Sequence, residues 1–358
     1  MNQKISIIGS AGIPAAYGGF ETLVEQLVRN SPQEYLGYKL VVYCSGKEKL
    51  KEFAGATLKY VNLNPNGISS IPYDVVSMIR AGIDKSNCLL VLGVSGAIFI
   101  PIYKFFFGGR IVTNVDGIEW RREKWSWLPS KFLKLSEFIA VRFSDEIISD
   151  NEAVAEYIFN EYGRKSIVIP YGGDHIDLSV KSKNNIYSKL KAFSYFLSVC
   201  RIEPENNIEI ILEAYSKIPT QDLVFIGNWD NSKYGKQLKN RFQQYKNLYL
   251  LNPIYEQSEL NFFRDGCIGY VHGHSAGGTN PSLVEAMYFS NFILCFDCDF
   301  NRFTTENSAQ YFLNSSELIE IIKNQDSKSQ DKTLLYEIAM RRYNWGLVSK
   351  AYFELFTA

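Results

Sequence analysis

The chain has 358 residues, enough for two domains, and 46% of them are hydrophobic while 21% are charged. This composition is typical of a folded globular protein and excludes a disordered chain, a collagen-like repeat and a small disulfide scaffold. Lys and Arg together number 38, as do Asp and Glu, so the net charge is zero and the basic character of a nucleic-acid-binding protein is absent.

Short apolar runs alternate with helical patterns in the first half of the chain. Strands are expected at Lys4–Gly9, Tyr38–Cys44, Thr57–Val61, Cys88–Leu92, Arg110–Asn114, Glu146–Ser149 and Ser166–Ile169. Helices are expected at Phe20–Arg29, Tyr73–Asp84, Lys131–Phe143 and Asn151–Glu161. This alternation is typical of a doubly wound parallel sheet.

Residues 86–103 carry no charge, and their number is marginal for a membrane-spanning helix. Gly93, Gly96 and Pro101 interrupt the stretch, however, and strands buried on both faces are themselves continuous apolar runs. We therefore predict a buried strand, a Gly/Ser loop and the start of an apolar helix.

The polar stretch 175–190 is the best candidate for a linker, because the alternating pattern restarts after it. Strands are expected at Phe196–Arg201, Leu223–Gly227, Leu248–Asn252, Ile268–His272 and Phe292–Phe296. Helices are expected at Asn206–Lys217, Lys233–Tyr245, Gln257–Arg264, Pro281–Phe289, Leu334–Arg342 and Trp345–Phe356. We expect one Rossmann-like domain at residues 1–177, a second at 190–344, and ligands at the carboxyl ends of the strands.

A long glycine-rich loop follows the first strand. Gly9, Gly12, Gly18 and Gly19 have neither the GxGxxG spacing of a dinucleotide site nor the Lys-Ser/Thr of a phosphate-binding P-loop. Gly18 and Gly19 allow backbone N–H groups to approach an anion at the start of the next helix. The alternative is an ordinary strand-to-helix turn.

A second glycine-rich loop, Gly277–Asn280, precedes a helix that begins at Pro281, a residue well suited to the first helical position. Such a helix start offers unpaired N–H groups to a phosphate. Glu285 lies about one turn further on, and its carboxylate suits acceptance of hydrogen bonds from two ribose hydroxyls. The alternative for Glu285 is a solvated charge on the helix surface.

Two further strand ends carry polar residues. Asp116 and Glu119 are suited to hydrogen bonds with sugar hydroxyls, and Trp120 is suited to stacking on a pyranose. Arg201 is placed to pair with a phosphate, and the alternative for it is an ion pair with Glu203 or Glu205.

Metal binding is weakly supported by the sequence. Most of the six cysteines lie in apolar runs, and a lone CxxC pair, Cys295 and Cys298, is weak evidence for zinc. The motif Asp297-Cys-Asp299 follows a buried strand, and we interpret it as chance. We expect no metal requirement and no cofactor.

These motifs together resemble those of family 4 GT-B glycosyltransferases, and within that family the bacterial rhamnosyltransferase-type branch. The resemblance rests on Gly12-Ile-Pro-Ala-Ala-Tyr-Gly-Gly-Phe-Glu-Thr22, Val115-Asp-Gly-Ile-Glu-Trp120, Arg201-Ile-Glu-Pro-Glu-Asn206, Ile226-Gly-Asn-Trp229, Gly278-Thr-Asn-Pro-Ser282 and Tyr343-Asn-Trp345. It covers nearly the whole chain and implies an α/β fold: two Rossmann-like domains facing across a cleft, with a C-terminal helix (345–358) returning to the first.

The resemblance also implies an activity. The protein would be a retaining glycosyltransferase that moves a sugar, rhamnose from dTDP-rhamnose, onto a lipid-linked oligosaccharide intermediate in bacterial surface polysaccharide synthesis (O-antigen or capsule). The donor would be a dTDP- or UDP-sugar, and the leaving phosphate would assist its own displacement. Rival hypotheses are a GT-B sugar-nucleotide epimerase and a non-catalytic nucleotide-sugar-binding module.

Roles carry over by position. The implied donor-binding residues are Gly18, Gly19, Arg201, Asn206, Gly277, Gly278, Thr279, Asn280 and Glu285. The implied catalytic residues are Asp116, Arg201 and Gly19, and the implied acceptor-binding residues are Tyr17, Glu119, Trp120 and Arg121. Two positions depart from the broad family, which has Glu where this chain has Gly277 and Lys where it has Asn206. Asn donates a weaker hydrogen bond to phosphate than a charged Lys does.

Residues 104–142 contain eight basic and four acidic residues, a local charge of +4, interleaved with aromatic side chains. Basic residues favour anionic membrane surfaces and aromatic rings favour the headgroup level. We expect a cytoplasmic protein that binds peripherally to the inner face of the plasma membrane. The alternative is a helix packed on the sheet with a solvated basic face.

Overall fold

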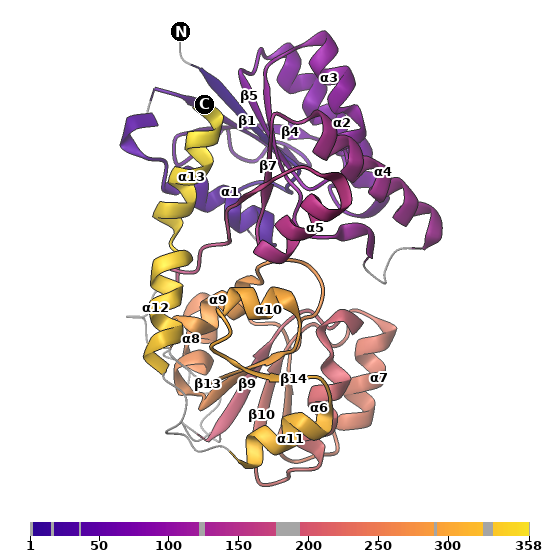
Figure 1. Ribbon diagram of the computed structural model, residues 1–358, viewed down its shortest axis with the longest axis vertical. Coiled ribbons are helices and arrows are strands. Elements are labelled where there is room, and N and C mark those ends of the chain that lie inside the picture. The colour runs from indigo at the N-terminus through magenta and orange to yellow at the C-terminus, as the bar shows by residue number, and fades with distance from the viewer. Residues whose placement is uncertain are drawn as a thin grey trace. The chain divides into compact units, whose positions relative to one another are not determined.

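The computed structural model describes residues 3–15, 18–35, 37–121, 126–176, 194–289, 292–324 and 332–357. The chain divides into two compact units (Figure 1). Unit 1 is Met1–Gly172 together with Trp345–Ala358, and unit 2 is Gly173–Asn344. Each unit is built on its own sheet.

Unit 1 contains an eight-stranded sheet with the order β3-β4-β2-β1-β5-β6-β7-β8, in which only the β3–β4 pair is antiparallel. Its strands are β1 (Lys4–Ile8), β2 (Lys39–Ser45), β3 (Glu52–Phe53), β4 (Ala56–Val61), β5 (Cys88–Leu92), β6 (Arg110–Asn114), β7 (Glu146–Ser149) and β8 (Ile167–Val168). Its α-helices are α1 (Gly19–Arg29), α2 (Ser70–Ile83), α3 (Ile100–Phe106), α4 (Trp127–Phe143), α5 (Glu152–Tyr162) and α13 (Trp345–Thr357).

The C-terminal helix α13 completes the core of unit 1. It lies against α1, and its Trp345, Tyr352 and Phe353 are buried in the same cluster as the apolar residues of β1, β2 and β5. Tyr352 Oη accepts a hydrogen bond from Asn114 Nδ2 at 2.6 Å. The chain therefore returns to its first unit, as the resemblance implied.

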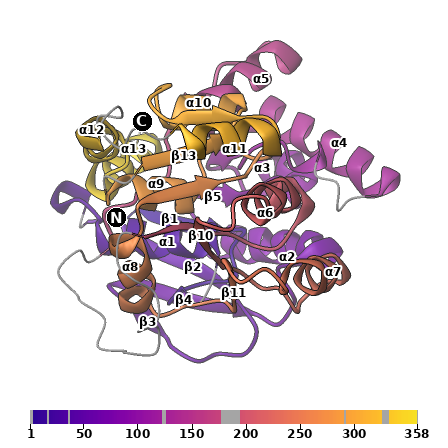
Figure 2. The ribbon, with the colours of Figure 1, turned by 90° about the horizontal axis from the view of Figure 1, so that it is seen from below.

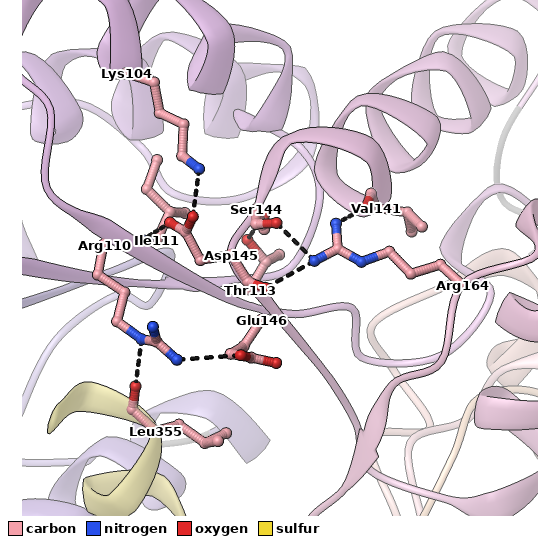
Figure 3. Close-up of polar contacts among 10 residues, drawn as sticks. All are labelled: Lys104, Arg110, Ile111, Thr113, Val141, Ser144, Asp145, Glu146, Arg164 and Leu355. Carbon is pink, nitrogen blue, oxygen red and sulfur yellow. Dashed lines mark hydrogen bonds and ion pairs between the residues drawn. The ribbon is translucent and has the colours of Figure 1, made fainter. Parts of the chain in front are cut away.

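A polar network holds the amino ends of β6 and β7 (Figure 3). Asp145 accepts hydrogen bonds from Lys104 Nζ and from the backbone N–H of Ile111, both at 2.7 Å. Arg110 Nε donates to the carbonyl of Leu355 in α13 at 2.7 Å, and its Nη2 contacts Glu146 at 3.1 Å. Lys104 and Arg110, two of the eight basic residues counted above, are therefore paired with carboxylates.

Unit 2 contains a fully parallel six-stranded sheet with the order β11-β10-β9-β12-β13-β14. Its strands are β9 (Tyr195–Val199), β10 (Asp222–Ile226), β11 (Leu248–Leu251), β12 (Gly269–His272), β13 (Phe292–Phe296) and β14 (Gln310–Phe312). Its α-helices are α6 (Ile208–Ser216), α7 (Lys233–Phe242), α8 (Gln257–Gly266), α9 (Pro281–Met287), α10 (Asp299–Thr304), α11 (Ser315–Lys323) and α12 (Lys332–Arg342).

Helices cover both faces of this second sheet (Figure 2). Residues of α8, α9 and α12 form one buried cluster, and residues of α6, α7 and α11 form another. Both faces of the strands are therefore removed from water, which explains their continuous apolar sequences.

The boundary between the two units lies earlier in the chain than expected. Residues 173–176 were expected in the first domain but lie in unit 2. The reason is contact: the N–H of Gly173 donates to the carbonyl of Tyr343 at 2.7 Å, and Ile176 is buried against α8 and α9. Most of the expected linker, residues 177–190, lies outside the described residues.

The uncharged stretch 86–103 forms strand β5 and most of helix α3, as predicted. Across the described ranges, no helix is both long enough and apolar enough to cross a membrane.

Candidate functional site

In unit 2 the winding of the chain changes direction between β9 and β12, which are neighbours in the sheet. Loop 200–207 follows β9 and loop 273–280 follows β12, so both start at the carboxyl edge where such folds bind ligands. Asn207 Nδ2 donates to the carbonyl of Gly273 at 2.8 Å, and the N–H of Ser275 donates to the carbonyl of Glu205 at 3.0 Å. The structure thus joins the two loops that the motifs singled out.

Arg201 begins the first of these loops, and its side chain is exposed. The predicted alternative, an ion pair with Glu203 or Glu205, is not formed, and the guanidinium has no ion pair with any other described residue. Its charge is therefore available to an anion.

Asn206 is buried, and both polar atoms of its amide bind protein. Nδ2 donates to the carbonyl of Arg201 at 2.7 Å, and Oδ1 lies 2.7 Å from His274 Nδ1, which therefore carries the proton. The expectation that Asn206 binds the donor stays a prediction, and its side chain already positions the Arg201 backbone and the His274 ring. Sequence reasoning missed this use of His274.

The loop before α9 has a conformation that its sequence explains. Gly277 has a φ of 117°, which L side chains rarely adopt. Thr279 is buried and Gly278 is half-buried. Asn280 is the N-cap of α9, and its Oδ1 accepts the N–H of Ser282 at 3.0 Å, so this oxygen helps to start the helix.

Glu285 is an enclosed carboxylate, with a side chain only 13% exposed. Its Oε2 accepts a hydrogen bond from Arg264 Nη2 of α8, a side chain that is 1% exposed. Its Oε1 lies 3.3 Å from His175 Nε2, and that side chain is 16% exposed. The interpretation of Glu285 as a solvated surface charge is therefore wrong.

The pKa of Glu285 reflects this pairing. Burial alone would raise it, but the charge of Arg264 and the hydrogen bond from His175 outweigh burial and hold the pKa below its usual value. The carboxylate is therefore charged at neutral pH. Sequence reasoning missed both partners, because nothing in their local sequence marks them.

His272 ends β12 and is buried beside Tyr270. Burial lowers its pKa to about 3, so the ring is neutral at physiological pH, and its Nε2 has no hydrogen-bond partner among the described residues. Asp297 of the Asp-Cys-Asp motif pairs with Arg302, at 2.5 Å and 2.8 Å. In the part of the chain that the structure describes, no three His, Cys, Asp or Glu side chains gather as metal ligands.

A cavity of about 460 Å³ opens at the carboxyl end of β11. It is lined by Leu250–Tyr255, Lys239 and Glu259. Glu259 belongs to α8, the helix that also carries Arg264.

In unit 1 the corresponding change of direction lies between β1 and β5. Gly9 and Gly18 of the loop after β1 have φ of 93° and 133°, and a Cβ at either would clash, with Leu92 O or with Glu21. Gly19 starts α1 with no atom within 4 Å of an added Cβ. Packing does not require glycine there, so the backbone is open to a ligand. Tyr17 lies outside the described residues.

The expected acceptor residues follow β6. Asp116 has a φ of 52°, and its N–H donates to Asn114 Oδ1 at 2.9 Å. Glu119, Trp120 and Arg121 form a short 3-10 helix.

The indole of Trp120 is held by protein contacts. Its Nε1 donates to Tyr157 Oη at 3.0 Å, and Tyr157 Oη donates to the buried carboxylate of Glu137 at 2.7 Å. Lys134 Nζ lies 4.7 Å and Arg121 Cζ 5.1 Å from the ring centroid. Cations thus occupy the ring surface that was expected to stack on a sugar.

Comparison with known proteins gives a family match for the first unit only. A family model described as "Domain of unknown function (DUF1972)" matches residues 2–174. No curated protein matches the chain.

Solved structures match along the whole chain. Sucrose-phosphate synthase from Thermosynechococcus elongatus has a TM-score of 0.81 at 13% identity, covering 99% of this chain and 98% of that one. A glycosyltransferase from Rickettsia africae has a TM-score of 0.75 at 13% identity, covering 99% and 98%. HepE from Anabaena, in complex with UDP-glucose, has a TM-score of 0.75 at 15% identity, covering 99% and 100%. At these identities the likeness shows the fold, and the predicted GT-B α/β fold is confirmed.

Proposed function

We propose that the protein is a glycosyltransferase that takes its sugar from a nucleoside-diphosphate donor bound in unit 2. Arg201 is the main support for this proposal. It is an exposed cation without an ion pair among the described residues. It lies at the point where the winding of the sheet changes direction, next to the loop that leads to Glu285. The structural neighbours support it, since HepE was solved in complex with UDP-glucose.

Each part of such a donor has a proposed place. Arg201 neutralises the diphosphate, because guanidinium pairs well with phosphate oxygens. Glu285 accepts a hydrogen bond from the nucleoside sugar, and the base lies in the cavity at the end of β11. In unit 1, the open backbone at Gly19 is available to an anionic group.

We further propose that transfer proceeds with retention of anomeric configuration and without a protein nucleophile. The acceptor hydroxyl attacks the anomeric carbon on the face from which the diphosphate leaves. The bond between that carbon and the phosphate oxygen breaks, and the departing phosphate takes the hydroxyl proton. Arg201 stabilises the charge that develops on the leaving group.

No metal is part of the proposal, because a protein cation serves the diphosphate and Asp297 is already paired with Arg302. Turnover should survive EDTA, and loss of turnover in EDTA that a divalent ion restores would contradict this point.

We propose rhamnose from dTDP-rhamnose as the transferred sugar and a lipid-linked glycan as its acceptor. Asp116 and Glu119 are the proposed hydrogen-bonding groups for acceptor hydroxyls. Trp120 serves by fixing its short helix through Tyr157 rather than by open stacking.

The test is release of nucleoside diphosphate from a panel of nucleotide sugars, with and without a lipid-linked acceptor, followed by the mass of the product. A glycosyltransferase releases diphosphate only when acceptor is present, and the product gains one sugar. A changed nucleotide sugar without acceptor would indicate an epimerase, and binding without any turnover would indicate a binding module.

We also propose that unit 1 binds peripherally to an anionic membrane. Apolar side chains contribute more to this binding, and basic side chains less, than the sequence suggested. Three of the basic residues are neutralised in the folded chain: Lys104 by Asp145, Arg110 by Glu146 and Lys134 by Glu161. All three carboxylates lie outside residues 104–142, the stretch whose charge was counted from the sequence. The basic contribution is therefore smaller than the sequence suggested. The apolar contribution remains, because large side chains are exposed on α3 and α4: Ile102, Phe105, Phe106, Trp127, Leu128, Leu135 and Phe138.

Liposome flotation tests this surface. Trp127→Ser with Leu128→Ser should reduce recovery with anionic vesicles, and 0.5 M salt should reduce wild-type recovery only partly. Ile83→Ser is the matched control, because Ile83 is equally exposed but lies on α2. Equal recovery of wild type and the double variant would contradict the proposal.

A further inference from the structure

The last residue of β6, Asn114, has both ends of its side-chain amide bound within unit 1. It is 3% exposed and lies inside the sheet, where β6 pairs with β5 and β7. Its Nδ2 donates to Tyr352 Oη at 2.6 Å, and its Oδ1 accepts the N–H of Asp116 at 2.9 Å. A hydrogen-bonded path therefore connects the C-terminal helix α13 to the turn that follows β6, although Asn114 and Tyr352 are 238 residues apart.

This turn has an unusual backbone. Asp116 has a φ of 52° and Gly117 a φ of 79°, so two successive residues adopt left-handed conformations. Glycine does so without penalty, whereas Asp is less favourable there and persists when its surroundings hold it. The hydrogen bond from the Asp116 N–H to Asn114 Oδ1 supports this conformation. Because the backbone conformation sets the direction of the Cα–Cβ bond, the same hydrogen bond helps to place the Asp116 carboxyl group.

Tyr352 fixes the other end of the Asn114 amide. It is 1% exposed and packed in the core of unit 1, so the position of its hydroxyl is determined by the core. Burial raises the pKa of Tyr352, the hydrogen bond from Asn114 opposes this shift, and the charges of Asp150 and Asp116 add to it. The hydroxyl is therefore protonated at physiological pH, and the Asp116 carboxylate lies near enough for its charge to act on it.

We propose that Tyr352 and Asn114 are positioning residues that hold Asp116 in the orientation in which it meets the acceptor. The inference rests on the proposed function, which assigns Asp116 to an acceptor hydroxyl. Without the Tyr352 hydroxyl, Asn114 Nδ2 would be buried without its acceptor, which is unfavourable. The amide would then lose the fixed orientation in which Oδ1 accepts the Asp116 N–H. Helix α13 thus serves the acceptor site as well as the core.

Tyr352→Phe tests the inference, because it removes one oxygen and keeps the buried ring. In the full chain, hydrogen exchange at the Asp116 N–H should become at least about fivefold faster, since this amide is held less well by its acceptor. With dTDP-rhamnose as donor and a lipid-linked disaccharide as acceptor, kcat/KM for the acceptor should fall about tenfold. The affinity for dTDP, measured by calorimetry, should not change, because its proposed site lies in unit 2.

Tyr43→Phe is the matched control. Tyr43 is fully buried in unit 1, but its hydroxyl donates to Asp84 at 2.8 Å, and Asp84 lies before β5 rather than after β6. This variant should lower the melting temperature to a similar extent and leave the acceptor kinetics unchanged. Asn114→Ala should reduce kcat/KM for the acceptor as Tyr352→Phe does. The double variant should lose no more than either single variant, because both act through the same hydrogen bond.

Unchanged exchange at Asp116 or an unchanged kcat/KM for the acceptor in Tyr352→Phe would overturn the inference. Additive losses in the double variant would also overturn it, and so would an equal loss in Tyr43→Phe, which would indicate a general effect of stability. A wild type that transfers no sugar to the acceptor would contradict the proposed function, and the inference would fail with it.

Discussion

The fold does not use the Arg201 side chain for an ion pair among the described residues. Its replacement should therefore affect nucleotide binding without affecting the stability of the protein. Arg201→Ala should weaken nucleoside diphosphate binding by about 10- to 150-fold, because a charge-assisted contact contributes about 1.5–3 kcal/mol. The melting temperature should hardly change, since the side chain is exposed without an ion pair among the described residues. Calorimetry checks the affinity.

Arg241→Ala is the control for that measurement. Arg241 is an exposed arginine of unit 2, but it pairs with Glu209 and Glu213 of α6. Its loss should leave the affinity unchanged. Equal weakening by both substitutions would show that only the general charge of unit 2 matters.

Glu285, the carboxylate proposed to bind the nucleoside, also contributes to stability, because it neutralises the buried Arg264. Glu285→Ala should lower the free energy of unfolding by about 3 kcal/mol, since it leaves a buried charge without its partner. The double variant Glu285→Leu with Arg264→Met should recover most of this loss, because it removes both charges together. Chemical denaturation measures both effects.

Asp230→Ala is the matched comparison, because it breaks an exposed ion pair with Lys239. It should hardly change the free energy of unfolding. If Glu285→Ala is as stable as Asp230→Ala, the buried pair does not have the role assigned to it.

The positions of candidate residues that follow a strand end were predictable, and the residues that contact them from elsewhere in the chain were not. Arg201 and Glu285 follow β9 and β12 in motifs, so their positions were found from the chain order. Arg264 lies 21 residues before Glu285 on another helix, and His175 enters from the segment before β9. The side chains meet only in the folded unit, where residues of α8 and α9 and Ile176, the neighbour of His175, share one buried cluster.

At the scale of elements, helix α2 carries two carboxyl groups with opposite pKa shifts. Burial raises the pKa of Asp74 to about 8, although hydrogen bonds from the Gly96 N–H and the Ser95 side chain oppose the shift. Burial also acts on Asp84 at the end of α2, but Lys59 and Tyr43 outweigh it and lower the pKa of that carboxyl.

The two groups should give opposite dependences of stability on pH. Because the pKa of Asp74 is higher in the folded chain than in the unfolded chain, this carboxyl stabilises the fold at pH values below its unfolded-state pKa. This contribution to stability is lost as the pH rises toward 8. Wild type should therefore lose about 2–3 kcal/mol relative to Asp74→Asn between pH 5 and pH 7. Denaturation at both pH values measures this difference.

Asp84→Asn is the comparison variant and should behave in the opposite way. It should lower the free energy of unfolding at neutral pH, and this loss should become smaller in acid. The reason is that the stabilisation by Asp84 disappears as the pH falls through its lowered pKa. Parallel pH profiles for wild type and Asp74→Asn would contradict the assignment.

Long periodic elements were predictable at this scale, whereas short ones were not. The helices α1, α5 and α8 begin and end within two residues of the expected bounds. The elements β3, β14 and α10 have two to six residues, too few to show a period, and tertiary pairing determines them. The helix α11 was missed although it has nine residues and an N-cap, Asn314.

At the scale of the whole molecule, the return of α13 makes the stability of unit 1 depend on residues from the end of the chain. Phe353 is buried in the core of unit 1. Phe353→Ala should destabilise that unit by about 3–5 kcal/mol, because it removes a large buried ring.

Hydrogen exchange followed by mass spectrometry resolves which unit responds. Protection should fall in β1 and β2 and persist in β9 and β10, since unit 2 has separate core clusters. Equal loss of protection in both sheets would show that the two cores are not independent.

The pairing of Rossmann-like units was predictable because strands and helices alternate along the chain twice. The net charge around α4 was not, since Asp145, Glu146 and Glu161 lie outside the counted stretch and reach its basic residues only in the folded chain.

Unit 2 is proposed to bind a nucleoside diphosphate between the loop that starts at Arg201 and the carboxylate of Glu285. A crystal structure of the protein with dTDP tests it most directly. The diphosphate should lie within hydrogen-bond distance of the Arg201 guanidinium, and a sugar hydroxyl should contact the Glu285 carboxylate while Arg264 stays bound to Oε2. A nucleotide bound elsewhere, with Arg201 and Glu285 contacting no part of it, would contradict this binding site.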